Sequence, residues 1–399
     1  MNTFRAFRHR NYTLFFIGQS VSQIGTWMQR TAVSWVVYTL THSTILLGMS
    51  VFVSQFPIFV FSLWGGVVAD RYNRYRILLV TQAASMLQAG LLTLFVLTNH
   101  YNIGVIFCLS GVLGIINAYD IPARQPLVHQ LVADKSELPN ALALNSAMVN
   151  FARLAGPALA GILLQQFSAG VCFLLNTVSF VAVIGSLLML RLPPYVSPGR
   201  KSRTDGGLKE MTEYLKRTPD LSLVLLMLIA MSFFVFPFDA LLPVFAKTTF
   251  HGDAATYGYI RSSIGLGAVI STFVLASLKP GADYRFILWL NSIILGIGII
   301  SFSHIANLPI ALAFAVIAGF GAMSQSTLYI TIIQLNADAS MRGRIMSLFA
   351  MAVYGMMPLG SLFIGTVSRF IGAPNALLCQ GLVGLVIAAL FTGFLLRRR

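Results

Sequence analysis

The most informative segment of the chain joins two apolar runs, at 45–69 and 77–98, and reads Gly65-Gly66-Val67-Val68-Ala69-Asp70-Arg71-Tyr72-Asn73-Arg74-Tyr75-Arg76. Each run is long enough to cross a bilayer as a helix, which needs about 20 apolar residues. The charged residues between them stand in a connection too short to form a domain. The segment therefore predicts a compact basic turn between two membrane-spanning helices.

The residue types of this turn suit a contact between helices. Gly65 and Gly66 are expected to let two backbones approach closely, and Asp70 can accept hydrogen bonds from Arg74 or from a neighbouring helix N-terminus. In the other interpretation, the three arginines are ordinary anchors on the cytoplasmic side of the membrane.

The composition is that of a polytopic membrane protein. The chain has 399 residues, of which 57% are hydrophobic and 10% are charged, whereas a soluble domain carries about 25% charged residues. The net charge is +15, but the placement of the bases matters more than their sum, so we expect no nucleic-acid partner. The three cysteines stand inside apolar runs without the spacing of a metal or redox pair.

Hydropathy predicts twelve spans, at 12–40, 45–69, 77–98, 103–127, 139–166, 170–191, 221–246, 255–278, 285–305, 309–335, 345–369 and 374–396. The first is too long for a signal-peptide core and is expected to be retained. Most bases fall in alternate connections, at Arg5, Arg8, Arg10, Arg71, Arg74, Arg76, Lys135, 191–217, Lys279, Arg285, Arg342, Arg344 and 397–399. The positive-inside rule then places both termini in the cytoplasm.

The domain organisation follows from the one long hydrophilic stretch. We expect an N-terminal bundle of six helices over 1–191, a cytoplasmic linker over 192–220 and a C-terminal bundle of six helices over 221–399. In the linker, Leu208, Met211 and Leu215 recur at helical spacing, which predicts a short amphipathic helix. This linker is either a covalent hinge between the bundles or a site for a regulatory partner.

A weak internal repeat supports two equivalent halves. The segment 131–136 aligns with 335–340, and at the same offset Gly156 meets Gly360 and Gly161 meets Gly365. We therefore expect the two halves of the chain to be structural repeats in parallel orientation.

Further motifs lie in the first half: Asp120-Ile121-Pro122-Ala123-Arg124-Gln125, the segment 138–146, which begins Leu138-Pro139-Asn140, and the segment 152–161, which contains Gly156-Pro157. With the turn after Gly65, they resemble the major facilitator superfamily of transporters, in particular the branch of enterobactin exporters and macrolide efflux proteins. The resemblance implies an all-α fold of twelve transmembrane helices in two six-helix bundles, and export by alternating access.

The resemblance also implies roles for two motifs. The turn would be a gating motif, made of Gly65, Gly66, Asp70, Arg71, Arg74 and Arg76 and meeting Arg342 and Arg344 at the start of a later helix. The second, similar to the superfamily's antiporter motif, comprises Gly156, Pro157 and Gly161; tight helix packing explains the same residues. The chain departs from the family pattern at Asn73, usually a glycine, and at Tyr75, usually a base. Because Asn tolerates a left-handed turn, the first departure is expected to be mild.

Placing an ionisable side chain at membrane depth costs free energy, so residues of this kind are candidates for a functional role. We expect Asp120 to lie near two cationic side chains, those of Arg124 and Arg153. Asp120 is then either a structural counter-ion or a proton-coupling group. Arg30 and Asp239 fall at nearly the same depth in the two halves, and would form either an outer gate that opens when Asp239 is protonated or a fixed pair.

Polar stripes are expected to line a cavity for a solute. The residues proposed for this role are Gln19, Gln23, Arg30, Asn117, Asn150, Thr327, Tyr329, Thr331 and Gln334. Hydroxyl groups on such stripes also join helices to one another, which is the alternative for the threonines.

No enzyme constellation, metal-ligand spacing or phosphate-binding loop emerges, so we expect no cofactor and a gradient-driven transporter. The predicted function is export of a siderophore-like compound across the bacterial inner membrane by a monomer, with proton antiport as the expected mode. The alternatives are multidrug or macrolide efflux, a passive facilitator, a lysophospholipid flippase and, in another class, an intramembrane enzyme.

Overall fold

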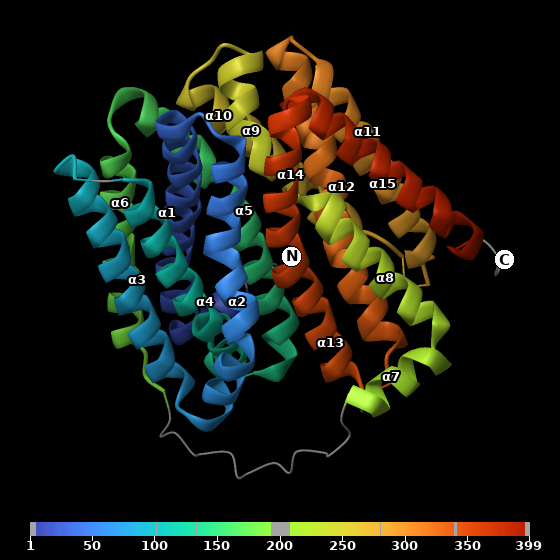
Figure 1. Cartoon of the computed structure of the whole chain (residues 1–399). Helices are drawn as coiled ribbons and strands as arrows, with labels where there is room; N and C mark the ends of the chain where they lie inside the picture. Colours follow the sequence, from blue (N-terminus) through green and yellow to red (C-terminus); the bar gives the residue numbers. More distant parts are fainter. Residues whose placement is uncertain are drawn as a thin grey trace. The chain divides into compact units, whose positions relative to one another are not determined.

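The computed structural model describes residues 5–100, 102–132, 134–192, 208–279, 281–338 and 341–395. These residues form helices and short connections, with no β-strand among them (Figure 1). Most of the predicted linker, at 193–207, lies outside the described residues, as does the basic C-terminal tail.

The helices match the predicted spans closely. The first part of the chain forms η1 (Arg5–Arg8), α1 (Arg10–Thr41), α2 (Thr44–Arg71), α3 (Arg74–Leu97), α4 (Ile103–Leu131), η2 (Lys135–Glu137), α5 (Leu138–Gln166) and α6 (Ala169–Leu188). The second part forms α7 (Leu208–Arg217), α8 (Pro219–Phe234), η3 (Phe236–Leu241), α9 (Leu242–Val244), η4 (Phe245–Thr249), α10 (Ala254–Ala276), α11 (Tyr284–His304), α12 (Leu308–Asn336), α13 (Arg342–Met351), η5 (Ala352–Met356), α14 (Met357–Ile371) and α15 (Ala373–Leu395). Helix α7 stands where the linker sequence has its helical spacing.

Eleven helical segments in the described part of the chain are long and apolar enough to cross a membrane. Helix α1 is not among them, although it is 32 residues long. Its apolar residues are interrupted by Gln19, Gln23, Gln29 and Arg30. The sequence predicted twelve spans. The difference is α1, which is not apolar enough to be counted as a span by hydropathy.

The span predicted over 221–246 is one irregular run rather than a regular α-helix. Helix α8 ends at Phe234, and the run continues through the 3₁₀-helix η3 and the short α9 into the π-helix η4. Pro237 and Pro243 lie within it, and each lacks the N–H that an α-helical hydrogen bond requires. Asp239 therefore lies on 3₁₀ backbone.

The turn between α2 and α3 differs from the sequence expectation at Asn73. Its φ is −64° and its ψ is 112°, so it is extended rather than left-handed. Its side chain accepts a hydrogen bond from the backbone N–H of Tyr75 at 2.9 Å and caps α3. Asparagine suits this position because it is a good N-cap, not because it tolerates positive φ.

By backbone contacts the chain divides into two compact units. Unit 1 consists of Met1–Thr41, Val53–Arg200 and Asp253–Ser262, and unit 2 consists of His42–Phe52, Lys201–Gly252 and Ser263–Arg399. The first turns of α2 thus belong to unit 2, and the first turns of α10 belong to unit 1. Each unit is described by itself below.

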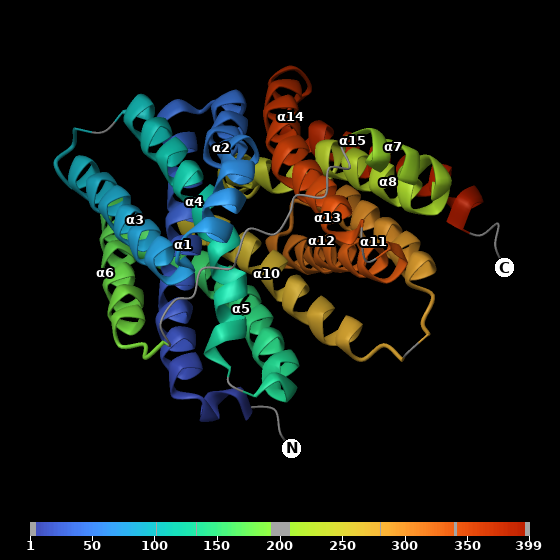
Figure 2. The same cartoon turned by 90° about the horizontal axis from the view of Figure 1, so that it is seen from below.

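In unit 1, α6 packs on both α1 and α3, α1 also packs on α5, and α3 on α4. Figure 2, which views the helices from below, shows α1 between α5 and α6. A buried cluster that includes Tyr12, Phe15, Leu78 and Phe180 joins these helices. The hydroxyl of Tyr12 donates to the carbonyl of Ala141 at 2.8 Å, which satisfies a polar group inside this apolar cluster.

In unit 2, α11 packs on α12 and α15, and α14 packs on α8, η3 and α15. Small residues allow the close approaches: a Cβ at Gly298 would lie 3.0 Å from the Cα of Ala318. The hydroxyls of Ser271 and Ser324 are 2.8 Å apart and are both buried, so they link α10 to α12. Small and hydroxyl residues commonly join helices in membranes in this way.

Two glycines of α5 lie in close backbone contacts within unit 1. A Cβ at Gly156 would lie 2.5 Å from the Cβ of Trp27 in α1, and a Cβ at Gly161 would lie 3.0 Å from the Cα of Gly258 in α10. Pro157 is buried between these glycines, and α5 continues through it to Gln166.

The repeat-related glycines of α14 have equivalent surroundings within unit 2. A Cβ at Gly360 would lie 2.8 Å from the Cγ of Pro237 in η3, and a Cβ at Gly365 would lie 3.3 Å from the Cα of Gly48 in α2. Gly156 and Gly360 thus each pack against the first helical run of their predicted half. Gly161 and Gly365 each pack against another glycine. This correspondence supports the internal repeat.

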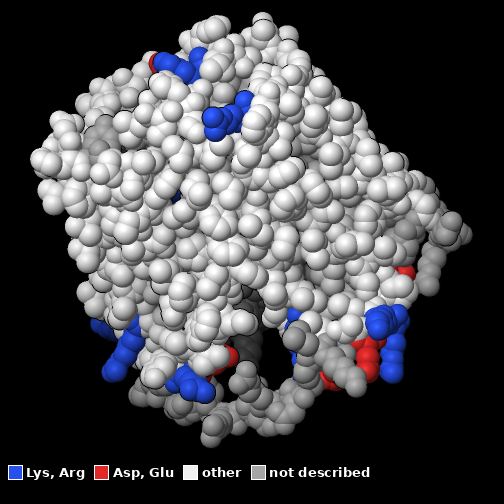
Figure 3. All heavy atoms as spheres, viewed as in Figure 1, with Lys and Arg blue, Asp and Glu red and all other residues white. Residues whose placement is uncertain are grey.

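The surface of the described chain has the charge distribution expected of helices surrounded by hydrocarbon. On the face drawn in Figure 3, the atoms along the middle of the helices are almost all uncharged, and most charged atoms lie toward helix ends. Charged side chains are costly where a helix faces lipid.

Candidate functional site

The two glycines that precede the α2–α3 turn have different surroundings. A Cβ at Gly65 would collide with the carbonyl oxygen of Ala118 in α4, whereas a Cβ at Gly66 would meet no heavy atom within 4 Å. Gly65 therefore permits the close contact of two backbones that the sequence predicts. The same expectation is wrong for Gly66, because its missing side chain would point into open space.

The charges of the turn form a loose surface arrangement. Asp70 Oδ1 is 3.7 Å from an Nη2 nitrogen of Arg74, and the Asp70 side chain is 81% exposed. The Nε of Arg74 donates to the carbonyl of Ala69 at 3.2 Å, near the end of α2. Arg71 and Arg76 are also exposed. The guanidinium of Arg74 thus binds both the carboxylate and the helix C-terminus.

The predicted partner residues of the turn lie in unit 2. Arg342 donates to the carbonyl of Ala337 at 3.3 Å, at the end of α12. Arg344 Nη1 donates to Glu210 Oε2 at 2.7 Å and so joins α13 to α7. The backbone N–H of Asp338 donates to the hydroxyl of Tyr214 at 3.0 Å, which is a second contact of α7 with this region. Helix α7 is therefore anchored within unit 2.

Replacement of Asp70 by alanine is expected to leave stability nearly unchanged, because an exposed ion pair contributes at most about 0.5–1 kcal/mol. If the turn is a gate, Asp70→Ala slows transport of the chain's substrate while its binding affinity stays within about twofold. Thermal melting, equilibrium binding and transport rate should be measured on the same preparation. Unchanged transport with lost binding would contradict a gating role.

Asp120 is the centre of a buried cluster in unit 1. It is 1% exposed, and its Oδ1 accepts from Thr81 Oγ1 and from Gln82 Nε2, both at 2.8 Å. Its Oδ2 accepts from Arg124 Nη2, one helical turn further along α4. The sequence predicted the Arg124 partner from the spacing within one helix, but not the two donors from α3. Three donors satisfy this carboxylate, as a buried charge requires.

The other predicted partner of Asp120, Arg153, lies against an indole ring. The guanidinium carbons of Arg30 and Arg153 are 5.3 Å and 5.1 Å from the ring centroid of Trp27. Both distances fall within the range of a favourable cation–π contact. Gly156 allows this arrangement, because it leaves room for Trp27 against α5. Two permanent positive charges thus share one aromatic ring between α1 and α5.

Trp27 is a functional candidate that the sequence reasoning missed. It stands three residues before Arg30, which places both side chains on one face of α1. That spacing is the signal that was available in the sequence. The approach of Arg153 to the same ring depends on the packing of α5 against α1 and had no sequence signal.

The predicted polar stripe of α1 is buried to different extents. Gln19 is 1% exposed, and its Nε2 has no hydrogen-bond partner among the described residues. Gln23 is half-buried, whereas Arg30 is exposed. The exposed end of the stripe is therefore the end that carries Arg30.

A second polar network in unit 1 was not predicted. Gln29 Nε2 donates to Gln88 Oε1 at 3.1 Å, and Asn176 Nδ2 donates to Gln29 Oε1 at 2.7 Å. Ser179 Oγ donates to Asn176 Oδ1 at 3.0 Å. All four residues are buried, so the network joins α1, α3 and α6. The only sequence signal for these residues is that each is a polar residue within a predicted span.

The remaining cavity residues lie on separate faces. Asn117 is half-buried in α4, and Asn150 is 3% exposed in α5. In α12, Thr327 and Thr331 are half-buried and Gln334 is exposed, but Tyr329 is fully buried on another face, with its hydroxyl 3.5 Å from Gln325 Oε1. The structure thus brings Thr327, Thr331 and Gln334 together and places Tyr329 in the helix-packing core.

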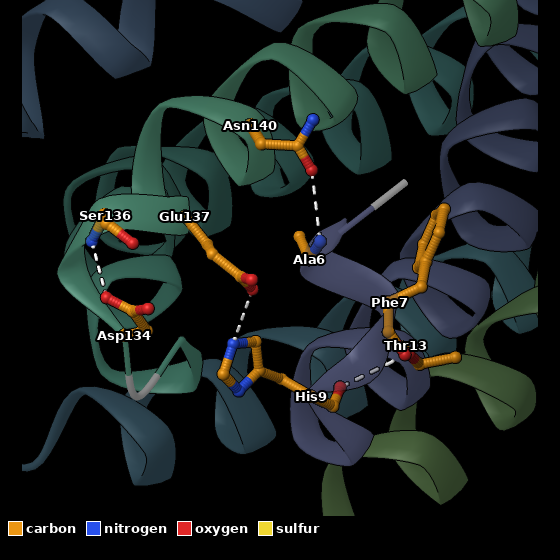
Figure 4. Close-up of polar contacts among 8 residues, drawn as sticks. All are labelled: Ala6, Phe7, His9, Thr13, Asp134, Ser136, Glu137 and Asn140. Carbon is orange, nitrogen blue, oxygen red and sulfur yellow. Dashed lines mark hydrogen bonds and ion pairs between the residues drawn. The ribbon is translucent and has the colours of Figure 1, made fainter. Parts of the chain in front are cut away.

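At one end of unit 1, polar contacts fasten the N-terminal segment to the start of α5 (Figure 4). His9 Nε2 is 2.9 Å from Glu137 Oε2, and the backbone N–H of Ala6 donates to Asn140 Oδ1 at 3.1 Å. Beside them, the backbone N–H of Ser136 donates to Asp134 and holds the pKa of that carboxyl below its usual value. Because the folded pKa is the lower one, this contribution to stability is present above pH of about 4 and is lost as the pH falls through the folded pKa.

In the described part of the chain, no group of three or more His, Cys, Asp or Glu residues is placed so that it could hold a metal ion. Cys108, Cys172 and Cys379 are free cysteines.

A family model described as "Transmembrane secretion effector" matches residues 1–398. The helical fold and this match define the chain as a multi-pass membrane transporter of the major facilitator superfamily, and not as an enzyme. It belongs to the transmembrane secretion effector family of that superfamily.

Individual proteins agree with this assignment. The chain is 27% identical over 382 residues to the staphyloferrin A transporter of Staphylococcus aureus, with 94% of each chain covered. It is 24% identical over 395 residues to the enterobactin exporter of Citrobacter koseri, covering 97% of this chain and 92% of that one. Among solved structures, the nucleoside transporter NupG has a TM-score of 0.73 at 10% identity and covers 97% of this chain and 99% of its own, which shows the fold alone.

Proposed function

We propose that this protein exports a siderophore-like organic anion across the bacterial inner membrane by alternating access. The observation that carries the proposal is the pair of guanidinium groups, Arg30 and Arg153, on the ring of Trp27. Both arginines lie near the middle of their helices, where a charge is expensive and is retained for function. Relatives that transport staphyloferrin A and export enterobactin support the substrate class and the direction.

The proposed architecture has twelve membrane-spanning helices in two six-helix bundles, over 1–191 and 221–399, joined by the linker at 192–220. Helix α1 is included as a span because its polar residues would face a solute pathway rather than lipid. Both termini are proposed to be cytoplasmic, because the bases fall in alternate connections. The protein would act as a monomer, with lipid and a small solute as its partners.

We further propose that transport is coupled to protons through Asp239 rather than Asp120. Asp120 is fully buried and held by three donors, which favours a structural role. Asp239 is half-buried on the 3₁₀-helix η3, where the backbone lacks regular α-helical hydrogen bonding. A pair of Arg30 with Asp239 would then be a gate that opens on protonation. The proposed cytoplasmic gate is Asp70 with the start of α13.

The test of the function uses two measurements. Cells with and without the protein should be grown under iron limitation, and siderophores outside the cells should be measured by mass spectrometry. Loss of an extracellular siderophore in cells without the protein supports export, whereas equal amounts in both strains would refute the proposed substrate.

Uptake into inverted vesicles should then depend on a proton gradient and lose that dependence in Asp239→Asn. Gradient-independent uptake would instead indicate a facilitator, and uptake of macrolides alone would indicate drug efflux.

Removal of one guanidinium from the Trp27 site is expected to weaken transport of an anionic substrate. We expect Arg153→Gln to lower the transport rate at limiting substrate by about tenfold, which corresponds to about 1.4 kcal/mol. The matched control is Arg369→Gln, which removes the same charge from the exposed end of α14. Equal losses in the two variants would show that net charge, and not this site, is responsible.

A further inference from the structure

A pocket in the described part of the chain lies wholly within unit 1, between α2, α3 and α4. It has a volume of about 790 Å³, which is within the range of ligand sites. It is separate from the Trp27 site, because neither Trp27 nor the two arginines on its ring line it. Its wall includes Thr81, the residue that donates to the buried Asp120.

The pocket is basic at one end and apolar at the other. Arg71, the last residue of α2, and Arg76, in the first turn of α3, line the basic end. Val80, Ala84 and Ile115 line the apolar part. From Arg76 to Ala84 the pocket follows α3 for about 12 Å, at about 1.5 Å per residue. No acidic side chain of the described chain lines it.

The apolar part of the pocket continues into the lipid-facing surface of α3. Val80, Leu87 and Leu94 are 68%, 65% and 56% exposed and recur every seven residues, so they form one stripe along the helix. In a membrane transporter, a stripe of large exposed apolar side chains on one helix face contacts hydrocarbon. An occupant of the pocket can therefore enter from the bilayer.

We propose that this pocket binds an anionic phospholipid of the leaflet that surrounds the α2–α3 turn. Its phosphate would contact Arg71 and Arg76, and an acyl chain would lie along Val80, Ala84 and Ile115. The basic rim matches the charge of the headgroup, and the apolar part excludes a fully solvated anion. A zwitterionic headgroup fits less well, because no carboxylate in the lining can pair with its ammonium group.

The test uses the full-length purified protein, equilibrated with equal amounts of phosphatidylglycerol and phosphatidylcholine. Lipid that remains bound after detergent extraction is counted by native mass spectrometry. We expect retention of phosphatidylglycerol over phosphatidylcholine by about fivefold, and a ratio near one in the double variant Arg71→Gln with Arg76→Gln. Ala84→Trp should lower retention of phosphatidylglycerol by filling the apolar part without changing charge, and it keeps the test valid if the double variant fails to fold.

The matched control is Lys279→Gln, which removes one exposed base from a connection that the sequence places on the same side of the membrane. It should keep the preference of the unmodified protein. The proposal is overturned if both lipids are retained equally, if Lys279→Gln loses the preference as fully as the double variant, or if both pocket variants keep it. Displacement of the lipid by excess inorganic phosphate would show a site for free anions and would also overturn it.

Discussion

Replacement of Asp120 by alanine is expected to lower the free energy of unfolding by about 3 kcal/mol, the lower end of the cost of breaking a buried ion pair. The variant leaves Arg124 without its carboxylate and removes the acceptor of Thr81 and Gln82. Arg124 retains 23% of its side-chain exposure, so water can solvate part of the orphaned charge. Reversible unfolding in mixed micelles measures the change.

A second Asp–Arg pair supplies the matched control. Asp70 and Arg74 have the same four-residue spacing as Asp120 and Arg124, but the Asp70 side chain is 81% exposed whereas that of Asp120 is 2% exposed. Double-mutant cycles to alanine should give a coupling energy above about 1.5 kcal/mol for the buried pair and below about 0.5 kcal/mol for the exposed pair. Equal coupling energies would show that burial does not determine the strength of the Asp120 pair.

The cycle also separates a structural from a proton-coupling role. If Asp120 is a structural counter-ion, the double variant Asp120→Ala with Arg124→Ala recovers part of the stability that Asp120→Ala loses, and transport recovers with it. If Asp120 carries the coupling proton, stability recovers but proton-dependent transport does not. The arrangement of three donors favours the first outcome.

Replacement of Gly65 by valine is expected to abolish transport and to lower the free energy of unfolding by about 2 kcal/mol, as is typical of overpacking. Its Cβ would collide with the carbonyl oxygen of Ala118, and backbone atoms on two packed helices cannot move aside as the end of a flexible side chain can. The expected result is separation of α2 from α4. Thermal melting and transport rate measure the two effects.

The neighbouring glycine is the control for this substitution. A Cβ at Gly66 would meet no heavy atom within 4 Å, so Gly66→Val should melt within a few degrees of the unmodified protein. Gly66→Ala should not be destabilised, because alanine favours a helix by about 1 kcal/mol relative to glycine. Equal damage from Gly65→Val and Gly66→Val would show that the close contact with Ala118 is not the cause.

Much of the fold could be predicted from the sequence, because a membrane imposes its requirements locally. The predicted span at 103–127 and the helix Ile103–Leu131 begin at the same residue, since a helix in hydrocarbon needs a continuous apolar run. The pair of Asp120 with Arg124 was also predictable, because both stand one turn apart on one helix. The role of Asn73 was not, since capping and left-handed geometry favour the same residue type.

The sequence by itself determined most of the helices, the basic turn at 65–76 and the polar stripe of α1 that contains Arg30. Only the tertiary structure decided that Gly65 packs against another backbone and Gly66 does not, that Tyr329 lies in the core, and that Arg153 reaches the ring of Trp27. The physical reason is the range of the interactions. Helical spacing relates residues within about one or two turns of the same helix. The contacts named above join residues on different helices, which only helix packing brings together.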